Sequence, residues 1–300
     1  MISFERVRLS HKQMITDAYY CDGKQNSEYS FANLFMWGRQ QVALVAGSIC
    51  VFSHWSGRSV YLYPEGGDTR SALQALMDDA LERGIPLRMH GLNQQEVKQL
   101  EEFFPGQFRF KPARDAFDYV YDIGRLADLK GKKLQQKRNH INRFLEAYPD
   151  WLSEPITPEL LPECRQMVED WYCHHEQLYG PGDFDLEQHA IARCFDNYVA
   201  IGMDGLVVRA EPGGKIIALT MGNRTAADTF DVNFEKAYGD IQGAYPLVNR
   251  TFARYLQEKY PELRYLNREN DMGLPGLRKA KESYHPDILA EKISAIRLEE

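Results

Sequence analysis

Apolar residues recur along the chain at two spacings, one typical of helices and one typical of strands. Apolar positions i, i+3 and i+4 predict a helix, whereas alternation or a short run of β-branched and aromatic residues predicts a strand. Helices are predicted at 11–21, 27–39, 68–86, 93–106, 129–144, 157–178, 185–202, 247–260 and 273–284. Strands are predicted at 40–55, 59–64, 87–92, 117–123, 204–211, 215–225, 227–238, 262–267 and 288–298, the last as one strand or a strand pair. This mixture predicts an α/β (α+β) fold.

The length of the chain favours two domains. A chain of 300 residues exceeds the size at which a single hydrophobic core usually stops growing. The predicted elements divide into residues 1–120 and residues 121–300, and the second part is the better punctuated. There, the "GPG" at 180–182 predicts a break between two helices. Each part is expected to contain a mixed sheet with helices.

Composition and charge exclude some classes of protein. Hydrophobic residues make up 44% of the chain and charged residues 26%, which is ordinary for a globular protein. The net charge of −7 argues against general adhesion to nucleic acid or anionic membranes, so no DNA partner is expected. No apolar run approaches the roughly 18 residues of a membrane span, and the first residues contain no signal-peptide core. Five cysteines without CxxC spacing fit reduced thiols. We therefore expect a cytoplasmic protein without an integral membrane segment.

A basic stretch at 129–144, LKGKKLQQKRNHINRF, contains no acidic residue. Its cationic residues include Lys132, Lys133, Lys137 and Arg138. On a helical wheel, Lys137 falls within the apolar arc of Leu134 and Ile141 rather than opposite it. Cations in the first turns of a helix oppose its macrodipole, and a bound anion would reverse that cost. The stretch therefore predicts either a solvated basic face or a site for phosphate, RNA or another anionic group.

Polar side chains are dense at 267–286, directly after a predicted strand, where α/β sheets usually place functional groups. Glu269 or Asp271 could act as a general base for an amine if its pKa were shifted toward neutrality. Tyr284 and His285 could donate protons. Further polar candidates in this stretch are Asn267, Arg278 and Lys281. The alternative is a structural network in which basic residues such as Arg268 and Lys281 pair with the acids.

Two further patterns lie in the same half of the chain. Strand alternation puts Asp231 and Asn233 on one face, which would either line a cleft or contact water. The turn that contains Gln242, Gly243 and Ala244 precedes a helix, and backbone amides in such a turn can hold a pyrophosphate. Its sequence matches neither GxxxxGK[ST] nor GxGxxG, so an ordinary turn is favoured. The His and Cys residues lack the usual spacing of metal ligands, and no metal is expected.

Five motifs together resemble a known family. They are SEYSFANLFMW, LKGKKLQQKRNHINRF, DVNFEKAY, GAYPLVNRTFA and YLNRENDMGLPGLRKAKESYHP, in this order between Ser27 and Pro286. The chain is similar to the phosphatidylglycerol lysyltransferase C-terminal domain family, in its short soluble bacterial form. This resemblance implies two tandem GNAT-like acyltransferase domains, each a mixed central sheet flanked by helices, and a relationship to the Fem-type aminoacyltransferases.

The resemblance also implies acyl transfer, with the site in the C-terminal domain. The candidate catalytic residues are then Glu269, Asp271, Asp231, Asn233 and Tyr284. The candidate ligand- or anion-binding residues are Lys132, Lys133, Lys137, Arg138, Gln242, Gly243, Ala244, Asn267, Arg278 and Lys281. No cofactor is certain. Residues 242–244 only loosely resemble the pyrophosphate loop of coenzyme A-dependent enzymes, so aminoacyl-tRNA is favoured over acetyl-coenzyme A as the acyl donor.

Two functions remain open at this point. The leading hypothesis is an acyl- or aminoacyltransferase that uses an activated donor, with a charged tRNA or an anionic small molecule as partner, and modifies an amine or hydroxyl. The alternative is a non-catalytic binding module of the same fold that senses an anionic ligand, because no unmistakable nucleophile–base pair occurs. A protein with no ligand is less favoured, because the polar cluster at 267–285 would then have no use.

Overall fold

The computed structural model describes residues 1–20, 25–55, 57–179 and 184–298. The predicted break at 180–182 and Cys21 lie outside the described residues. Cys50, Cys164, Cys173 and Cys194 are free thiols, as expected. Among the described residues, no helix is both long enough and apolar enough to cross a membrane.

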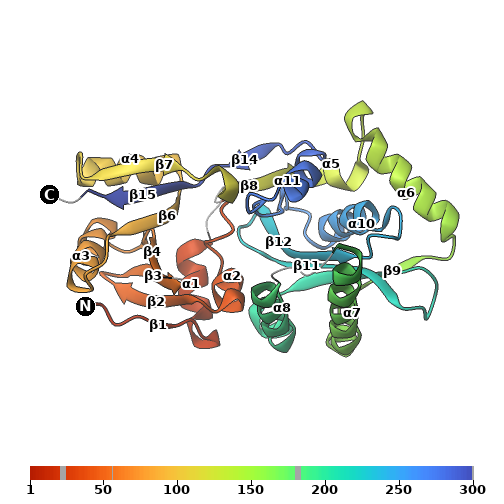
Figure 1. Ribbon diagram of the computed structural model, residues 1–300, viewed down its shortest axis with the longest axis horizontal. Coiled ribbons are helices and arrows are strands. Elements are labelled where there is room, and N and C mark those ends of the chain that lie inside the picture. Colours follow the sequence, from red (N-terminus) through yellow and green to blue (C-terminus); the bar gives the residue numbers. More distant parts are fainter. Residues whose placement is uncertain (21–24, 56, 180–183, 299–300) are drawn as a thin grey trace.

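An eight-stranded mixed sheet forms one end of the molecule (Figure 1). Its strands are β1 (Glu5–Arg6), β2 (Gln40–Val45), β3 (Ser48–Trp55), β4 (Arg58–Leu62), β5 (Glu65–Gly66), β6 (Arg88–Leu92), β7 (Phe108–Pro112) and β15 (Ile293–Arg297). They lie in the order β1-β2-β3-β4-β6-β15-β7, and β5 pairs with β3. The helices of this part are α1 (Lys12–Tyr19), α2 (Phe31–Trp37), α3 (Thr69–Glu82) and α4 (Gln94–Phe103), with 3-10 turns at Leu9–His11 and Arg114–Ala116.

A seven-stranded mixed sheet forms the other end. Its strands are β8 (Asp118–Asp122), β9 (Leu152–Pro155), β10 (Asp204–Arg209), β11 (Ile216–Arg224), β12 (Thr229–Ala237), β13 (Tyr265–Asn267) and β14 (Ile288–Ala290). They lie in the order β14-β8-β13-β12-β11-β10-β9. The helices are α5 (Ile123–Asp128), α6 (Gln135–Ala147), α7 (Leu161–Tyr179), α8 (Asp185–Asp196), α9 (Tyr198–Ile201), α10 (Ala244–Lys259) and α11 (Pro275–Glu282), with 3-10 turns at Lys132–Leu134 and Pro158–Leu160. The predicted fold class, two mixed sheets flanked by helices, is confirmed.

Side-chain caps begin α3 and α4 where the sequence predicts these helices to begin, whereas α2 begins four residues later than predicted. The side chain of Asp68 accepts a hydrogen bond from the backbone N–H of Ser71 and so caps α3. Asn93 and Glu96 form a reciprocal capping box at the start of α4. Ser30 caps α2 in the same way through the backbone N–H of Asn33. The last of these caps fixes the orientation of α2, which supplies a residue to the candidate site.

The end of the chain connects the two sheets. The last stretch, predicted as one strand or a strand pair, forms two strands. Strand β14 pairs with β8 in the second sheet, whereas β15 lies between β6 and β7 in the first. Strand β8, which begins at Asp118, belongs to the second sheet. The predicted division at residue 120 stays a prediction about domains, yet the first sheet is completed only by the last strand of the chain.

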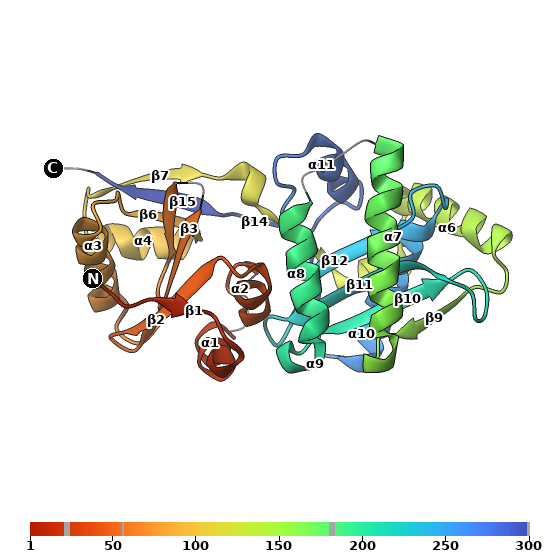
Figure 2. The same cartoon turned by 60° about the horizontal axis from the view of Figure 1, so that its bottom comes forward.

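One hydrophobic cluster runs from the first sheet to one face of the second. It includes residues of the N-terminal part together with residues of α7, α8 and β11 such as Met167, Ile191 and Leu219. The opposite face of the second sheet packs against α5, α6 and α10 through a second cluster. Helix α2 lies beside α8 (Figure 2). The two halves therefore share a continuous core on one side of the second sheet.

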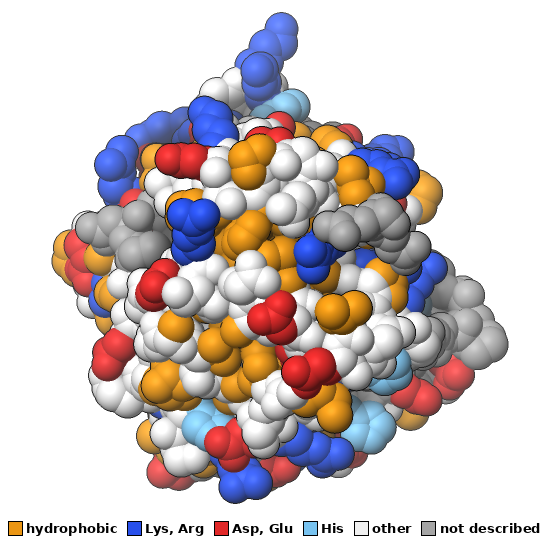
Figure 3. All heavy atoms as spheres, turned by 90° about the vertical axis from the view of Figure 1, so that its left-hand side faces the viewer, with side chains coloured by type: hydrophobic (Ala, Val, Ile, Leu, Met, Phe, Trp, Pro, Cys, Tyr) orange, Lys and Arg blue, Asp and Glu red, His pale blue; other side chains and the backbone are white. Residues whose placement is uncertain are grey.

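The end of the molecule that the first sheet forms has a mixed surface. In Figure 3, hydrophobic side chains on this face are interrupted by acidic and basic ones. Its exposed apolar residues include Leu44 and Leu81. A face with both signs of charge interspersed does not provide the single-sign field that attracts a polyanion.

Candidate functional site

The second sheet opens between two parallel strands. Strands β12 and β13 pair in parallel only as far as Asp231 and Asn267. Beyond that pair β12 continues to Ala237, whereas β13 has ended. After this pair, the residues of β12 are no longer hydrogen-bonded to β13, which leaves an opening at the edge of the pairing. Helix α10 connects the two strands in the sequence.

A β-bulge distributes the polar residues of β12 to both faces of the sheet. The pairing with β11 shifts from Val232 to Phe234, which leaves Asn233 as the extra residue. Asp231 and Asn233 share one face, as alternation predicts, and Asn233 Nδ2 lies 3.3 Å from Asp231 Oδ2. Glu235 lies beyond the bulge and contacts Arg268 and Asn249 instead.

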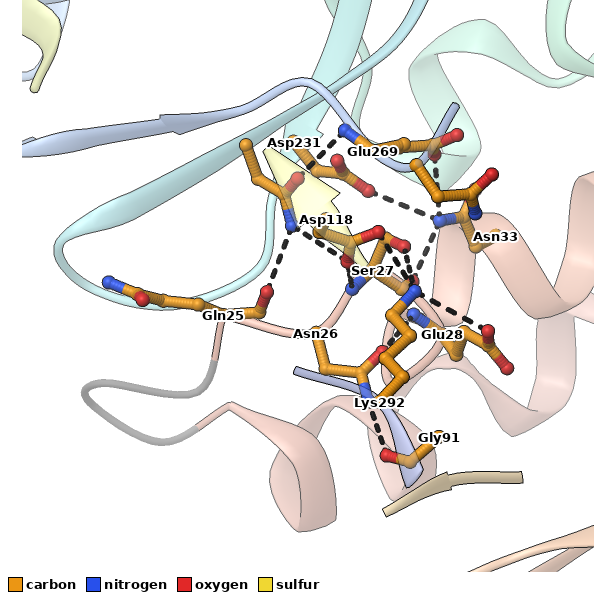
Figure 4. A network of polar contacts seen from close by, with 12 residues as sticks. Gln25, Asn26, Ser27, Glu28, Asn33, Gly91, Asp118, Asp231, Glu269 and Lys292 are labelled. Atoms are coloured by element: carbon orange, nitrogen blue, oxygen red, sulfur yellow. Dashed lines mark hydrogen bonds and ion pairs between the residues drawn. The ribbon is translucent and has the colours of Figure 1, made fainter. Parts of the chain in front are cut away.

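Three carboxyl groups meet on the face that is turned toward the N-terminal half. We call Asp118, Asp231 and Glu269, with their amide donors Asn33 and Asn233, the carboxylate centre (Figure 4). Asn33 Nδ2 lies 3.1 Å from Asp231 Oδ2 and 3.1 Å from Glu269 Oε1. Asn233 Nδ2 lies 3.2 Å from the same oxygen of Glu269. Two amide groups therefore hold two carboxyl groups close together.

Burial and mutual repulsion change the ionisation of this pair. Asp231 is fully buried and Glu269 is partly exposed. Burial raises the pKa of Asp231 well above its usual range, and the charges of Glu269 and Asp118 raise it further. Burial and the charge of Asp118 also raise the pKa of Glu269, although Lys281 opposes this shift. Close carboxyl groups that repel each other favour a shared proton.

The backbone holds Glu269 in an unusual conformation. Its φ is +53°, in the left-handed region that residues other than glycine rarely adopt. The ammonium group of Lys281 donates to the carbonyl oxygens of Arg268, Glu269 and Asn270, and Asn267 Oδ1 accepts from the backbone N–H of Glu269 at 2.8 Å. Such strain persists only where the surroundings impose it, and it clusters at functional sites.

A buried lysine forms an ion pair with one carboxyl group of the carboxylate centre. Lys292 precedes β15, is fully buried, and lies 2.9 Å from Asp118 Oδ1. It also contacts Ser27 Oγ at 3.1 Å and Glu28 Oε1 at 3.4 Å. Burial alone would lower the pKa of Lys292, but the charges of Asp118 and Glu28 outweigh it and raise this pKa. Lys292 therefore stays charged. Its ion pair with Asp118 links the segment before β15 to the carboxylate centre.

A second cluster lies on the opposite face of the sheet, and we call Lys137, Glu235, Arg268 and Tyr284 the Arg268 cluster. Arg268 Nη2 lies 2.7 Å from Glu235 Oε1. Lys137 Nζ lies 4.0 Å from the centre of the Tyr284 ring, and the guanidinium carbon of Arg268 lies 5.0 Å from it. Burial, with the charge of Arg268, lowers the pKa of Lys137 to about 8. Arg268 Nη1 is buried without a hydrogen-bond partner among the described residues.

Asp271 lies apart from both clusters in an ion-pair network. Arg278 binds it with two nitrogens at 2.7 and 2.9 Å, and the Tyr119 hydroxyl donates to it at 2.6 Å. Arg114 lies 3.3 Å away. The bonds from Arg278 hold the pKa of Asp271 well below its usual range despite its burial. This arrangement favours the structural alternative for Asp271 and Arg278, since a carboxylate that is ionised and fully paired is a poor general base.

The other predicted ligand residues are dispersed. Lys132 and Lys133 are exposed, and Arg138 donates to the carbonyl oxygens of Leu129 and Gly131. Gln242 is exposed and Ala244 is buried. Gly243 has a φ of +89°, and a Cβ there would lie 2.3 Å from the carbonyl oxygen of His140. The close approach of this backbone to α6 therefore explains why a glycine is present at position 243.

Asn267, predicted as a ligand residue, instead supports the carboxylate centre. Its Nδ2 lies 3.2 Å from Asp118 Oδ2 and 3.0 Å from the carbonyl oxygen of Gln25. Sequence reasoning missed Asn33, Asp118 and Lys292. One signal was available for Asn33, an amide inside the otherwise apolar helix FANLFMW. Among the described residues no cluster of side chains is suited to hold a metal ion.

Two helix-flanked mixed sheets, the second opened between β12 and β13, define the class of fold to which the chain belongs. The chain belongs to the family "Phosphatidylglycerol lysyltransferase, C-terminal", whose model matches residues 23–296. No curated protein matches the chain. Among solved structures, the chain is similar to a conserved protein of unknown function from Bacteroides thetaiotaomicron, with 35% identity, a TM-score of 0.92, and coverage of 99% of this chain and 100% of that one.

Two more distant structures share the fold. L-PGS from Bacillus licheniformis is 15% identical with a TM-score of 0.68, and the match covers 98% of this chain and 93% of that one. FemX is 10% identical with a TM-score of 0.60, over 98% and 97% of the two chains. At these identities the likeness concerns the fold, and it agrees with the predicted relationship to Fem-type proteins.

Proposed function

We propose that this chain transfers an aminoacyl or acyl group from an activated ester to an amine or hydroxyl acceptor. The observation that carries the proposal is the carboxylate centre, where Glu269 lies partly exposed beside the buried Asp231 at the opening between β12 and β13. Family membership supports the reaction class, because the family is named for a lysyltransferase.

Glu269 is the general base of this proposal. The acceptor nitrogen or oxygen attacks the ester carbonyl, a new bond forms to the carbonyl carbon, and the ester C–O bond breaks. The acceptor proton passes to Glu269, and the leaving oxygen then takes a proton. A carboxyl group with a raised pKa suits both steps, because it can accept and return a proton near neutral pH. Asn33 and Asn233 orient Glu269, and Asp231 lies behind it.

Aminoacyl-tRNA is our preferred donor. The Arg268 cluster, on the other face of the opened strands, offers cationic groups to an anionic part of the donor, and Arg268 Nη1 lacks a partner among the described residues. The exposed Lys132 and Lys133 would add long-range attraction for a polyanion. Acetyl-coenzyme A is less favoured, since Gly243 packs against α6 and is not free to cradle a pyrophosphate.

Transfer from labelled aminoacyl-tRNAs, and separately from acetyl-coenzyme A, to a panel of amines and hydroxyl compounds tests the proposal. Glu269→Gln should lower kcat at least about a hundredfold, the usual contribution of a general base. The control Glu282→Gln removes an exposed carboxylate of the same C-terminal stretch and should leave kcat unchanged. Absence of transfer from every donor, in protein that is folded, would rule the proposal out.

The second candidate function is a non-catalytic module that binds an anion. The Arg268 cluster favours it, because a partly buried guanidinium with a free N–H group can hold an anion without any turnover. Binding of RNA or phosphate that weakens with salt, together with no transfer, would support this function over the first.

A further inference from the structure

A cavity between the two halves is separate from both clusters. It has a volume of about 190 Å³ and is lined by α1, the start of α2, the end of α9, the β11–β12 hairpin, Tyr260 after α10, and Asp204 at the start of β10. The carboxylate of Asp204 is paired with Lys259 and with the Tyr260 hydroxyl. Aromatic side chains dominate its wall: Tyr19, Tyr20, Tyr29, Phe31 and Tyr260. Planar rings pack well in such surroundings. A cavity of about 150 Å³ accepts benzene, and pockets for drug-sized ligands start at about 300 Å³. The size therefore fits one ring with short substituents.

The floor of this cavity adjoins the carboxylate centre. Asn223, which lines the cavity, is paired directly across the sheet with Asp231. Residues paired in this way have side chains on the same face, with Cβ atoms about 5 Å apart. Asn223 Nδ2 donates to Ser30 Oγ, and Ser30 caps the helix that presents Asn33 to Glu269. A ligand at the floor would lie one side chain away from the carboxyl pair.

The polar groups of the cavity differ between floor and rim. At the floor, Asn223 Nδ2 also donates to the carbonyl oxygen of Arg224, which fixes the orientation of the amide. Asn223 Oδ1 is then a buried acceptor without a partner among the described residues. At the rim, Lys12 is partly exposed and donates to the carbonyl oxygen of Ala200 at 2.8 Å, which leaves further N–H groups. Arg224 adds a second positive charge, although Glu262 pairs with it at 2.8 Å.

We propose that this interdomain cavity binds a single-ring aromatic acid that carries an amine or hydroxyl group, and that this molecule is the acceptor. The ring lies among the tyrosines, the carboxylate faces Lys12, and the amine or hydroxyl donates toward Asn223. Its role as acceptor rests on the proposed function, whereas its binding does not.

The test is equilibrium binding of 4-aminobenzoate to the full chain, measured by calorimetry and by ligand-detected NMR. Benzoate, which lacks the donor, and aniline, which lacks the anion, should each bind at least about tenfold more weakly. Thr16→Phe places a ring in the cavity and should abolish binding, whereas the matched control Thr16→Val keeps the volume and should bind normally. Lys12→Gln should weaken 4-aminobenzoate several-fold and leave aniline unchanged.

The outcomes separate this proposal from the proposed function. Failure of 4-aminobenzoate to bind, or equal binding to wild type and Thr16→Phe, would overturn the cavity proposal even if transfer to other acceptors occurred. Binding that Thr16→Phe abolishes, without transfer from any donor, would support the cavity as a ligand site and count against transferase activity. Transfer to the bound amine that Thr16→Phe removes would support both.

Discussion

Asn33 Nδ2 lies 3.1 Å from Glu269 Oε1, although one residue belongs to the N-terminal half and the other to the C-terminal half. The same nitrogen lies 3.1 Å from Asp231 Oδ2. The carboxylate centre is therefore completed by the opposite half of the molecule. Neither half alone would hold these two carboxyl groups in this geometry.

Replacement of Asn33 tests this dependence. Asn33→Ala removes a donor that two carboxyl groups share, and we expect a loss of about 1–3 kcal/mol in the free energy of unfolding. Asn33→Asp should cost more at pH 7, because it brings another carboxyl group to the pair, and this extra cost should shrink at pH 5. Urea unfolding at both pH values measures this. Gln136→Glu, an exposed change of the same charge, is the control, and an equal effect there would contradict the assignment.

Asp231 is expected to destabilise the folded protein as pH rises. Its pKa in the folded state is raised by burial and by Glu269, so its contribution to stability is fully present below the unfolded pKa of about 3.9 and is lost as pH rises toward the folded pKa. Asp231→Asn removes the titrating proton and keeps the size of the side chain. Its stability relative to wild type should therefore increase from pH 5 to pH 8. A difference that stays constant over this range would show that Asp231 is ionised without cost.

Asp271 is expected to change stability with pH in the opposite direction from Asp231. Its pKa is held below the usual range, chiefly by Arg278, so its contribution is present above pH about 4 and is lost as pH falls toward the folded pKa. Asp271→Asn should cost about 2 kcal/mol at pH 7 and progressively less in acid. Denaturation curves at pH 7 and below pH 4 provide the comparison. If the cost persisted undiminished in acid, the Asp271–Arg278 pair would not be its source.

Local patterns in the sequence were sufficient to predict parts of the site. Alternation along one strand placed Asp231 and Asn233 on the same face, and the helical wheel showed Lys137 among apolar residues, where it contacts Tyr284. Both inferences depend only on the geometry of a single element. The succession of helices and strands likewise predicted two mixed sheets, because most of the helices and the central strands were long enough to show their period.

The remainder depended on contacts between distant segments. Lys292 reaches Asp118 because the last strand returns to the first sheet, and no local pattern encodes that return. The sequence left Asp271 open as a general base or as a member of a structural network, and the bonds from Arg278 and Tyr119 favour the network. Strand β7 was missed because only Phe108 among its residues is fully buried, so alternation is weak.

Gly243 distinguishes a packing requirement from a phosphate-binding loop. Its positive φ and its approach to the His140 carbonyl oxygen disfavour any side chain. We expect Gly243→Ala to lower the free energy of unfolding by about 1–3 kcal/mol, and to do so without any ligand. Gly276→Ala is the matched control, since a Cβ there meets nothing within 4 Å and helical alanine is favoured. The measurement is thermal unfolding of the wild type, Gly243→Ala and Gly276→Ala. An unchanged melting temperature for Gly243→Ala would contradict the packing requirement and favour a binding role for the turn.

Lys137 should make anion binding depend on pH near neutrality. Because burial and Arg268 lower its pKa to about 8, Lys137 loses its charge between pH 7 and pH 9, and affinity for an anion at the Arg268 cluster should fall over this range. Inorganic sulfate, whose own charge is constant from pH 7 to pH 9, serves as the probe and is titrated by calorimetry at constant ionic strength. Lys137→Arg keeps the charge at both pH values and should abolish the pH dependence, whereas Lys137→Gln should weaken binding at pH 7 alone. Lys133→Gln, on an exposed residue, is the control. A pH dependence that survives in Lys137→Arg would assign the titration to another group and remove Lys137 from the anion site.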